Sequence, residues 1–353
     1  MKGFGIVKSH EQAGWITKDV NYEENLGPFD AVCHSVMAST CTSDVHQVFH
    51  AYLPEGLILG HEVISRVEKV GSMVKRFKPG DIVSCTAVNP NWRSLDIEDN
   101  IPQHTDGILC GMDWSATCDG TFAEHYVIRD IDMNATYIPE GITMEQALMC
   151  NDMMTTGFHA AESIDFKYGD TVVICGVGPV GLMALAGTAL RGAGTIIAVG
   201  RRQITFDLAK HYGANYCINY QDGPIDQQVL ELTGGRMPDA CIIAGGEMES
   251  FKQCVNMVKP NGTVFNLVGQ GQPTDFDVMT TVQWCAHKKV TGGLCPGGAR
   301  RLERLFKMIL AGRVDPTPLI THKFTGFEAI EPAFNIMCEP KVAEIVKPVI
   351  YTE

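Results

Sequence analysis

Apolar residues recur with two different patterns along the chain. From residue 1 to about residue 150, short apolar runs at Ala31–Met37, Ile64–Val70 and Ile82–Cys85 alternate with turn signals such as Lys78-Pro79-Gly80-Asp81. No helical period is sustained in this part, which predicts a compact, β-rich, barrel-like domain. The segment Asn89–Gly120 is rich in Asp, Asn and Gly and is expected to form an irregular surface lobe.

From Thr155 the pattern changes to alternating strands and helices, which is typical of an α/β fold with a parallel sheet. The expected strands are Val172–Cys175, Thr195–Val199, Tyr216–Tyr220, Asp239–Ala244, Thr263–Val268 and Lys289–Thr291. The C-terminal run VKPVIY also predicts a strand, which we expect to return to the first domain.

An amphipathic helix is predicted after Cys295-Pro296-Gly297-Gly298. Its apolar face consists of Leu302, Leu305, Phe306, Ile309 and Leu310. Three arginines are expected to form its solvated face, namely Arg300, Arg301 and Arg304.

The stretch Thr171–Arg202 carries a dinucleotide-binding pattern. A buried strand ends in a G-x-G-x-x-G loop that opens directly into the apolar helical run Leu182–Leu190, and a second strand follows. The first glycine permits the tight turn, the second lets backbone N–H groups approach a pyrophosphate, and the third lets helix and strand pack closely. A glycine-rich turn in another kind of α/β protein is the alternative. The loop residues are Gly176, Val177, Gly178, Pro179, Val180 and Gly181.

The end of the second strand indicates which cofactor binds. An NAD site places a carboxylate about 20 residues past the loop, whereas this chain has Gly200 followed by Arg201 and Arg202. A glycine leaves room for a 2′-phosphate, and guanidinium groups supply charge and donors. The sequence therefore predicts NADP, with Tyr220 against the adenine. Two solvated arginines after a strand are the alternative.

Composition narrows the class of partner. The net charge of −13 argues against nucleic acid or anionic membrane as a partner, and no apolar run is long enough to span a bilayer. The N-terminus lacks the apolar core of a signal peptide. Thirteen cysteines without a CxxC motif suit reduced thiols. We therefore expect a cytoplasmic protein that acts on small molecules.

Three separate places hold candidate metal ligands, namely Cys41, the pair His61-Glu62, and Asp152. A thiolate, an imidazole and a carboxylate form a donor set that suits Zn²⁺. Three protein ligands also leave one position open for a substrate oxygen. Spacing alone is weak support, because single Cys and His residues are more often core or surface residues.

The motifs CTSDVH, ILGHE, KPGD, DMMTTGFH, GVGPVGLM, KPNG and GGLCPGG run through nearly the whole chain. Together they resemble the zinc-dependent medium-chain alcohol dehydrogenases, and within them the NADP-dependent secondary-alcohol group. The resemblance implies a GroES-like β-rich catalytic domain of residues 1–153 and 296–353, and a Rossmann NADP-binding domain, a doubly wound parallel sheet, of residues 154–295. It also implies a homotetramer that reversibly oxidises small secondary alcohols to ketones and accepts aldehydes.

The same resemblance places zinc on Cys41, His61 and Asp152, with Glu62 as a nearby carboxylate able to join or leave the metal. In many relatives the third ligand is a cysteine five residues before a glycine, and Asp152 keeps that spacing to Gly157. Cys150 is the alternative ligand on grounds of softness.

Further roles are implied for three neighbours of Cys41. Ser43 would take the alcohol's proton and pass it towards His46 near the cofactor ribose, and Asp44 would accept from the far N–H of His61. A turn serine and an exposed histidine are the alternative. The resemblance also implies contacts with the cofactor from Leu267, Val268, Gly269 and Lys341.

Two departures from the family pattern change the expectations. The lobe that carries a second zinc in longer relatives has only Cys110 and Cys118 here, so we expect one catalytic zinc and no structural zinc. Met112 and Gly269 stand where the family usually has Trp and Tyr, which favours a larger or more open pocket. The alternatives to this function are a zinc-independent quinone or enoyl reductase of the same fold, and a non-catalytic NADPH-binding protein.

Overall fold

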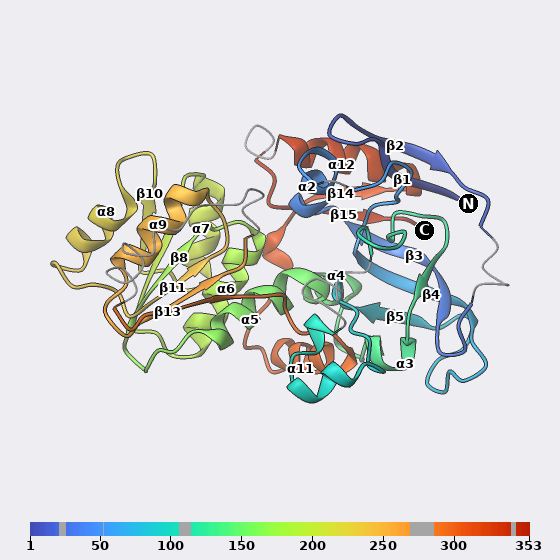
Figure 1. Cartoon of the computed structure of the whole chain (residues 1–353), viewed down its shortest axis with the longest axis horizontal. Coiled ribbons are helices and arrows are strands. Elements are labelled where there is room, and N and C mark those ends of the chain that lie inside the picture. The colour runs from blue at the N-terminus through green and yellow to red at the C-terminus, as the bar shows by residue number, and fades with distance from the viewer. Residues whose placement is uncertain (21–25, 52, 106–113, 269–285, 340–343) are drawn as a thin grey trace. The chain divides into compact units, whose positions relative to one another are not determined.

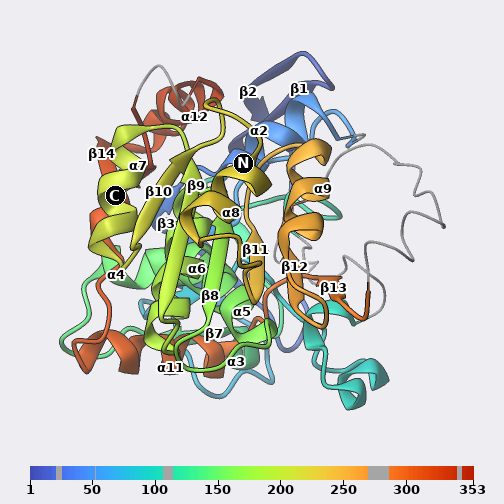
Figure 2. The same ribbon diagram turned by 90° about the vertical axis from the view of Figure 1, so that its left-hand side faces the viewer.

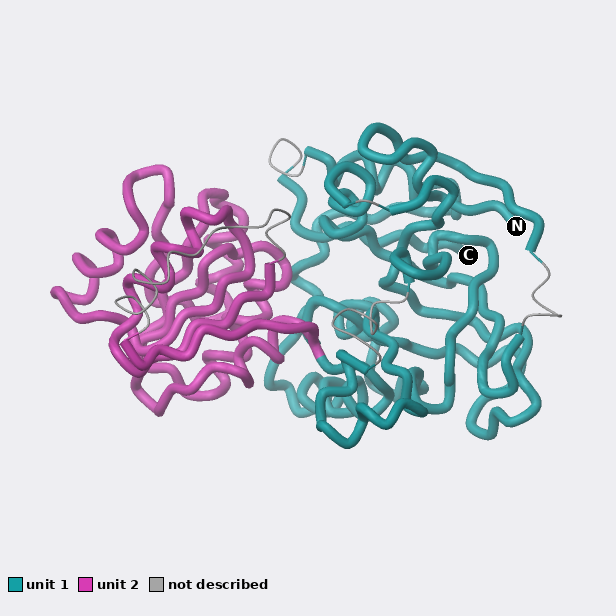
Figure 3. The backbone as a smooth tube through the Cα atoms, viewed as in Figure 1, with its two compact units in different colours: residues 1–155, 296–353 teal, residues 156–295 magenta. Residues whose placement is uncertain are grey.

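The chain forms two compact units. The computed structural model describes residues 1–20, 26–51, 53–105, 114–268, 286–339 and 344–353. Unit 1 comprises Met1–Thr155 and Pro296–Glu353, and unit 2 comprises Thr156–Cys295 (Figure 3). None of the described helices has the length and apolar character that a membrane span requires.

Unit 2 contains a six-stranded parallel sheet with the order β10-β9-β8-β11-β12-β13 (Figure 1). The central strand β8 is buried along Val172–Cys175 because helices cover both faces of the sheet, which explains its continuously apolar sequence. The strands are β8 (Thr171–Cys175), β9 (Thr195–Gly200), β10 (Tyr216–Asn219), β11 (Ala240–Ile243), β12 (Thr263–Asn266) and β13 (Lys289–Gly292).

The helices of unit 2 lie on two sides of this sheet (Figure 2). Right-handed crossovers place α6 and α7 on one face, and the return from β10 past β8 to β11 places α8 on the other, where it packs against α9. The reversal between β8 and β11 is a topological switch point, where such sheets bind ligands at the carboxyl ends of the strands. The helices are α5 (Thr155–Ser163), α6 (Pro179–Leu190), α7 (Gln203–His211), α8 (Ile225–Leu232) and α9 (Met248–Met257).

Unit 1 is built on a seven-stranded sheet. Its order is β14-β15-β3-β4-β5-β7, with β6 paired to β3, and the described strands form an open path beside the two-stranded ribbon β1-β2. As expected, the C-terminal strand pairs with a strand of the first segment, because β15 runs antiparallel to β3. The strands are β1 (Lys2–Lys8), β2 (Gln12–Thr17), β3 (Ala31–Ser39), β4 (Glu62–Val70), β5 (Ile82–Cys85), β6 (Tyr126–Ile128), β7 (Ala135–Tyr137), β14 (Ile320–Thr325) and β15 (Lys347–Tyr351).

Several short helices also lie in unit 1, although no helical period was visible in the first 150 residues. Helices of three to eight residues make only one or two turns, which is too few for a period to emerge from the sequence. They are α2 (Thr42–Phe49), α3 (Ile131–Asn134), α4 (Met144–Met149), the π-helical segment Cys150–Met154, and 3₁₀ turns at Leu95–Asp99 and Pro102–His104. The C-terminal segment adds α11 (Ala299–Leu310), α12 (Ile330–Cys338), and 3₁₀ turns at Thr317–Leu319 and Phe327–Ala329.

Two predictions about the exposure of residues in helix α11 are wrong. Arg300 and Arg304 are exposed as expected, but Arg301 is buried. Its guanidinium donates from Nε to Thr155 Oγ1 at 2.9 Å and from Nη2 to the Thr155 carbonyl at 2.8 Å. The prediction that Arg301 is solvated is therefore wrong, because tertiary packing supplies acceptors for the charge. Leu310, the last helical residue, is half exposed rather than part of the buried face.

Candidate metal centre and nucleotide loop

Cys41 stands at the N-terminus of α2, where Asp44 fixes it. The carboxylate of Asp44 accepts hydrogen bonds from the Cys41 backbone N–H at 2.8 Å and from the Gly60 N–H at 3.3 Å. Asp44 is fully buried, so these donors stabilise a charge that burial alone would disfavour. The carboxylate thereby ties the start of the helix to the loop before β4.

His61 follows that loop, and its position depends on Gly60. Gly60 has a φ of +95°, and a Cβ there would lie 2.3 Å from the Phe122 ring, so only glycine fits. The buried His61 ring places Nδ1 3.2 Å from Asp44 Oδ1, at an angle outside that of a hydrogen bond. Its Nε2 lies 3.2 Å from Ser43 Oγ.

Asp152 projects from the π-helical segment, a local widening that is frequent at functional sites. The preceding residue, Asn151, is fully buried and anchored by two hydrogen bonds. Its side chain donates to the Val63 carbonyl at 2.6 Å and accepts from Ser84 Oγ at 2.6 Å. These bonds fix the backbone beside Asp152, whose partly buried side chain lies close to Cys41 and His61.

Four side chains from these places converge. Cys41, His61, Glu62 and Asp152 each offer a ligand atom, and these atoms lie within 4.8 Å of one another, the one such group among the described residues. Asp152 Oδ2 is 3.9 Å from Cys41 Sγ and 3.7 Å from His61 Nε2. Cys150 is fully buried and lies outside the group, its Sγ 3.6 Å from Met154 Sδ. The geometry thus favours Asp152 over Cys150 as a ligand.

The electrostatics of this group suit a cation. Burial disfavours the charged form of His61, but the negative charge of Asp44 and the contacts with Asp152 and Cys41 raise its pKa well above the ordinary value. Burial also raises the pKa of Glu62 to about 7, and its Oε2 has no hydrogen-bond partner among the described residues. Excess negative charge and an orphaned buried oxygen fit a divalent metal, and the donor set fits zinc.

Lys347 is a member of this site that the sequence did not reveal. It lies at the start of β15, is fully buried, and places Nζ 2.5 Å from Glu62 Oε1. Burial lowers its pKa, but the charges of Glu62, Cys41 and Asp152 outweigh burial and raise it. The available signal was a lysine inside an apolar run, since a buried charge requires a partner.

Ser43 and His46 both lie on α2, but among the described residues no hydrogen bond joins their side chains. The His46 ring packs edge-on against His50, with centroids 5.4 Å apart. Burial and the neighbouring His50 lower the pKa of His46, which keeps its imidazole neutral near pH 7. A proton therefore cannot pass directly from Ser43 to His46 in this structure, and its transfer needs an intervening group.

In unit 2 the glycine loop joins β8 to α6 with little space for side chains. A Cβ on Gly181 would lie 1.8 Å from the Gly176 carbonyl oxygen, and one on Gly176, where φ is +90°, would lie 2.5 Å from Gly245 N. Gly178, the N-cap of α6, faces open space, with no atom within 4 Å of a Cβ there. This opening at a helix N-terminus, between Val177 and Pro179, suits a phosphate group.

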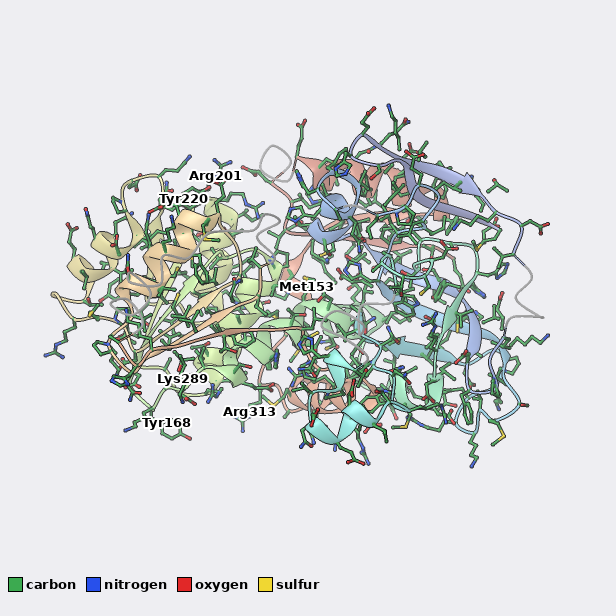
Figure 4. The ribbon with its side chains drawn as sticks, viewed as in Figure 1. Met153, Tyr168, Arg201, Tyr220, Lys289 and Arg313 are labelled. Carbon is green, nitrogen blue, oxygen red and sulfur yellow. The ribbon has the colours of Figure 1, made fainter. Side chains whose placement is uncertain are left out.

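The predicted 2′-phosphate site lies at the end of β9. A Cβ on Gly200 would lie 2.6 Å from Val177 Cγ2, so an acidic side chain there would crowd the glycine loop. Arg202 occupies the N-cap position of α7, and Tyr220, which follows the end of β10, donates its N–H to the Gly200 carbonyl at 3.2 Å. Figure 4 shows Arg201 and Tyr220 at the same end of the sheet.

The remaining residues that were predicted to contact the cofactor lie after β12 or outside the described residues. Leu267 donates its N–H to the Ile243 carbonyl at 2.8 Å, and the Asn266 side chain donates to the Val268 carbonyl at 2.9 Å. These bonds hold the start of the predicted nicotinamide loop beside β11. Outside the described residues lie Gly269, Lys341, Met112 and Cys110.

Comparisons with known proteins agree along the chain. Residues 27–140 match the alcohol dehydrogenase GroES-like domain, and residues 179–310 match the zinc-binding dehydrogenase domain. The chain is 46% identical to the NADP-dependent isopropanol dehydrogenase of Thermoanaerobacter brockii and 43% identical to that of Clostridium beijerinckii, with 99% of each chain covered. The solved zinc-dependent alcohol dehydrogenase 2 from Streptococcus pneumonia is similar at 26% identity and a TM-score of 0.87, covering 100% of this chain and 99% of the other. The chain therefore belongs to the zinc-binding, medium-chain alcohol dehydrogenase family, with a GroES-like domain and a Rossmann domain.

Proposed function

We propose that this protein is a zinc-dependent secondary-alcohol dehydrogenase that reversibly transfers a hydride between NADP(H) and a small secondary alcohol or ketone, and that also accepts aldehydes. The observation that carries the proposal is the group Cys41, His61, Glu62 and Asp152, whose ligand atoms lie within 4.8 Å of one another. The relatives from Thermoanaerobacter brockii and Clostridium beijerinckii, both named NADP-dependent isopropanol dehydrogenases, support the substrate class and the cofactor.

In this proposal Cys41, His61 and Asp152 hold the metal. When bound, zinc is a Lewis acid that lowers the pKa of an alcohol hydroxyl. Ser43 Oγ, already 3.2 Å from His61 Nε2, receives the hydroxyl proton and passes it towards His46, whose lowered pKa leaves it free to accept a proton at neutral pH.

The nucleotide loop performs the complementary task of holding NADP. The open space at Gly178 admits the pyrophosphate to the N-terminus of α6. Arg201 and Arg202 pair with the 2′-phosphate, and Tyr220 lies against the adenine. We assign the nicotinamide contacts to the loop that begins at Leu267.

We further propose one catalytic zinc and no structural zinc per chain, a cytoplasmic homotetramer, and domain limits at residues 1–153 and 296–353 for catalysis and 154–295 for NADP. All described cysteines are free thiols, which supports a reducing compartment. The zinc-independent reductase and the non-catalytic NADPH-binding protein are disfavoured by the converging ligand group. Neither of these two kinds of protein needs a group of converging metal ligands.

Asp152→Ala tests the metal assignment. It removes one of three ligands, so zinc content and turnover should fall together, turnover by at least about 100-fold. Metal analysis measures the zinc content, and the oxidation of 2-propanol by NADP⁺, followed through the NADPH formed, measures turnover. Cys150→Ala is the matched control, because it removes a neighbouring thiol outside the group and should keep the zinc. Full turnover of the Asp152 variant would refute the assignment.

Arg201→Ala tests the cofactor assignment. Loss of charged hydrogen bonds to the 2′-phosphate should raise the KM for NADPH by about 10- to 100-fold. The KM for NADH should stay unchanged, since NADH lacks that phosphate. Arg236→Ala, an exposed arginine elsewhere in unit 2, is the control. Equal effects on both cofactors would exclude a phosphate contact.

A further inference from the structure

Lys347 is a fully buried lysine to which the mechanism above gives no role. Its Nζ donates to Glu62 Oε1 at 2.5 Å and to the Thr40 carbonyl at 3.1 Å. An ammonium group without solvent is stable only when it is paired. Its partner here is Glu62, the one carboxylate of the metal group (Cys41, His61, Glu62 and Asp152) that the proposed function does not use as a ligand.

The sheet order brings the two residues together. Strands β15 and β4 flank β3, so Lys347 at the start of β15 meets Glu62 at the start of β4 although 285 residues separate them. Ser39, which is paired with Glu62 in the β3–β4 register, donates its hydroxyl to the Pro348 carbonyl at 2.7 Å. This bond fixes the backbone beside Lys347. The ammonium is therefore held in place by rigid strands.

Glu62 is tethered at one oxygen only. Lys347 takes Oε1, which lies 3.8 Å from His61 Nε2, while the buried Oε2 has no hydrogen-bond partner among the described residues. Glu62 lies beside the three proposed ligands and has one oxygen without a partner among the described residues. Its carboxylate would therefore be a strong fourth ligand if it could rotate towards the metal. The contact with Lys347 opposes that turn.

Counting the charges of the buried site leads to the same conclusion, that Lys347 keeps Glu62 off the metal. The Cys41 thiolate, Asp152 and Glu62 carry three negative charges, whereas a divalent ion supplies two positive charges. Lys347 supplies the third, so the buried group is neutral with the metal bound. Without Lys347, the extra negative charge would draw Glu62 onto the metal.

We propose that Lys347 is a positioning residue that holds Glu62 beside the metal and so keeps the fourth coordination position open for substrate. This inference rests on the proposed zinc site. It assigns Lys347 a function beyond packing, which is to decide how many protein ligands the metal has.

The test uses the full-length protein loaded with zinc or with Co²⁺. In Lys347→Met, Glu62 should join the metal, so zinc release to a chromogenic chelator should slow by about 10-fold. Imidazole, a small probe for an open position, should shift the cobalt absorption bands of the wild type. The variant should need about 10-fold more imidazole for the same shift.

Two further variants separate positioning from a structural role. Lys347→Arg keeps the charge and should restore wild-type zinc release and imidazole binding. The double variant E62Q/K347M removes the carboxylate that Lys347 restrains, so it should also return both readouts towards wild type. If Lys347→Met does not fold, Lys347→Gln, which is neutral but still a donor, takes its place in the same comparison.

The outcomes are distinct. Unchanged zinc release and imidazole titration in Lys347→Met, or no recovery in E62Q/K347M, would overturn the positioning role. A wild-type protein that binds no zinc would instead overturn the proposed function, because the comparison begins from a loaded wild-type site.

Discussion

The metal group of unit 1 and the glycine loop of unit 2 are built in opposite ways. The metal group gathers charged side chains from a helix start, a strand start and a π-helical segment, with Cys41 and Asp152 separated by 111 residues. The glycine loop is six consecutive residues, Gly176–Gly181, whose proposed function depends on the backbone and on the absence of side chains. One site depends on charge balance, and the other depends on space.

This difference determines what should disrupt each site. Removing a charge from the buried group leaves its partner without compensation in a medium of low dielectric constant. Adding a methyl group to the glycine loop creates a clash or blocks an opening, with no change in charge. Exposed charges in either unit are screened by water and should matter least.

The largest stability effect should come from the buried ion pair. Lys347→Met leaves Glu62 buried and unpaired, so the free energy of unfolding of the zinc-free protein should fall by about 3–5 kcal/mol. The matched variant Lys289→Met removes the exposed partner of Asp165 in unit 2 and should leave the free energy of unfolding close to that of the wild type. Urea denaturation of both variants measures the contrast. Equal losses would show that burial does not control these pairs.

Intermediate effects are expected in the glycine loop. Gly181→Ala places a Cβ against the Gly176 carbonyl and should destabilise unit 2 by about 1–3 kcal/mol while weakening NADPH binding.

Gly178→Ala places its methyl group in open space, so Tm should not change. The methyl group would obstruct the pyrophosphate, however, and the Kd for NADPH should rise by about 10-fold. Calorimetry with NADPH titration tests both, and normal NADPH affinity in Gly178→Ala would place the pyrophosphate elsewhere.

The smallest effect should come from an exposed charge of unit 1. Arg66 donates two hydrogen bonds to Glu353, at 2.9 and 2.7 Å. Arg66 and, after it, the neighbouring His34 lower the pKa of Glu353 to about 2 from the usual 4.5. A lowered folded-state pKa stabilises the protein above about pH 4.5, and this contribution disappears as the pH falls towards 2. Because the side chain is over a third exposed, Glu353→Gln should cost only about 0.5 kcal/mol at pH 6.

Urea denaturation of Glu353→Gln and wild type between pH 3 and 7 measures this difference. A gap that widens as the pH falls would contradict the assigned direction of the pKa shift.

Local sequence determined most of unit 2. Its strands were predicted to within about two residues. The clearest signal came from the inner strands β8, β9 and β11, because a strand covered on both faces is continuously apolar. The glycine loop and Gly200 were equally visible, since their steric requirements arise within a few neighbouring residues. In unit 1 the sequence identified candidate ligands at Cys41, His61 and Asp152, but spacing alone gave only weak support for them.

Only the tertiary structure decided which charged side chains are buried together. Lys347 meets Glu62 because β15 and β4 flank the same strand, and Arg301 meets Thr155 because α11 packs beside the end of the π-helical segment. Neither pairing leaves a local pattern, because the partner that makes burial of a charge tolerable lies more than 140 residues away. Periodicity reports which face of an element is apolar, whereas the fate of a charge depends on what the fold places opposite it.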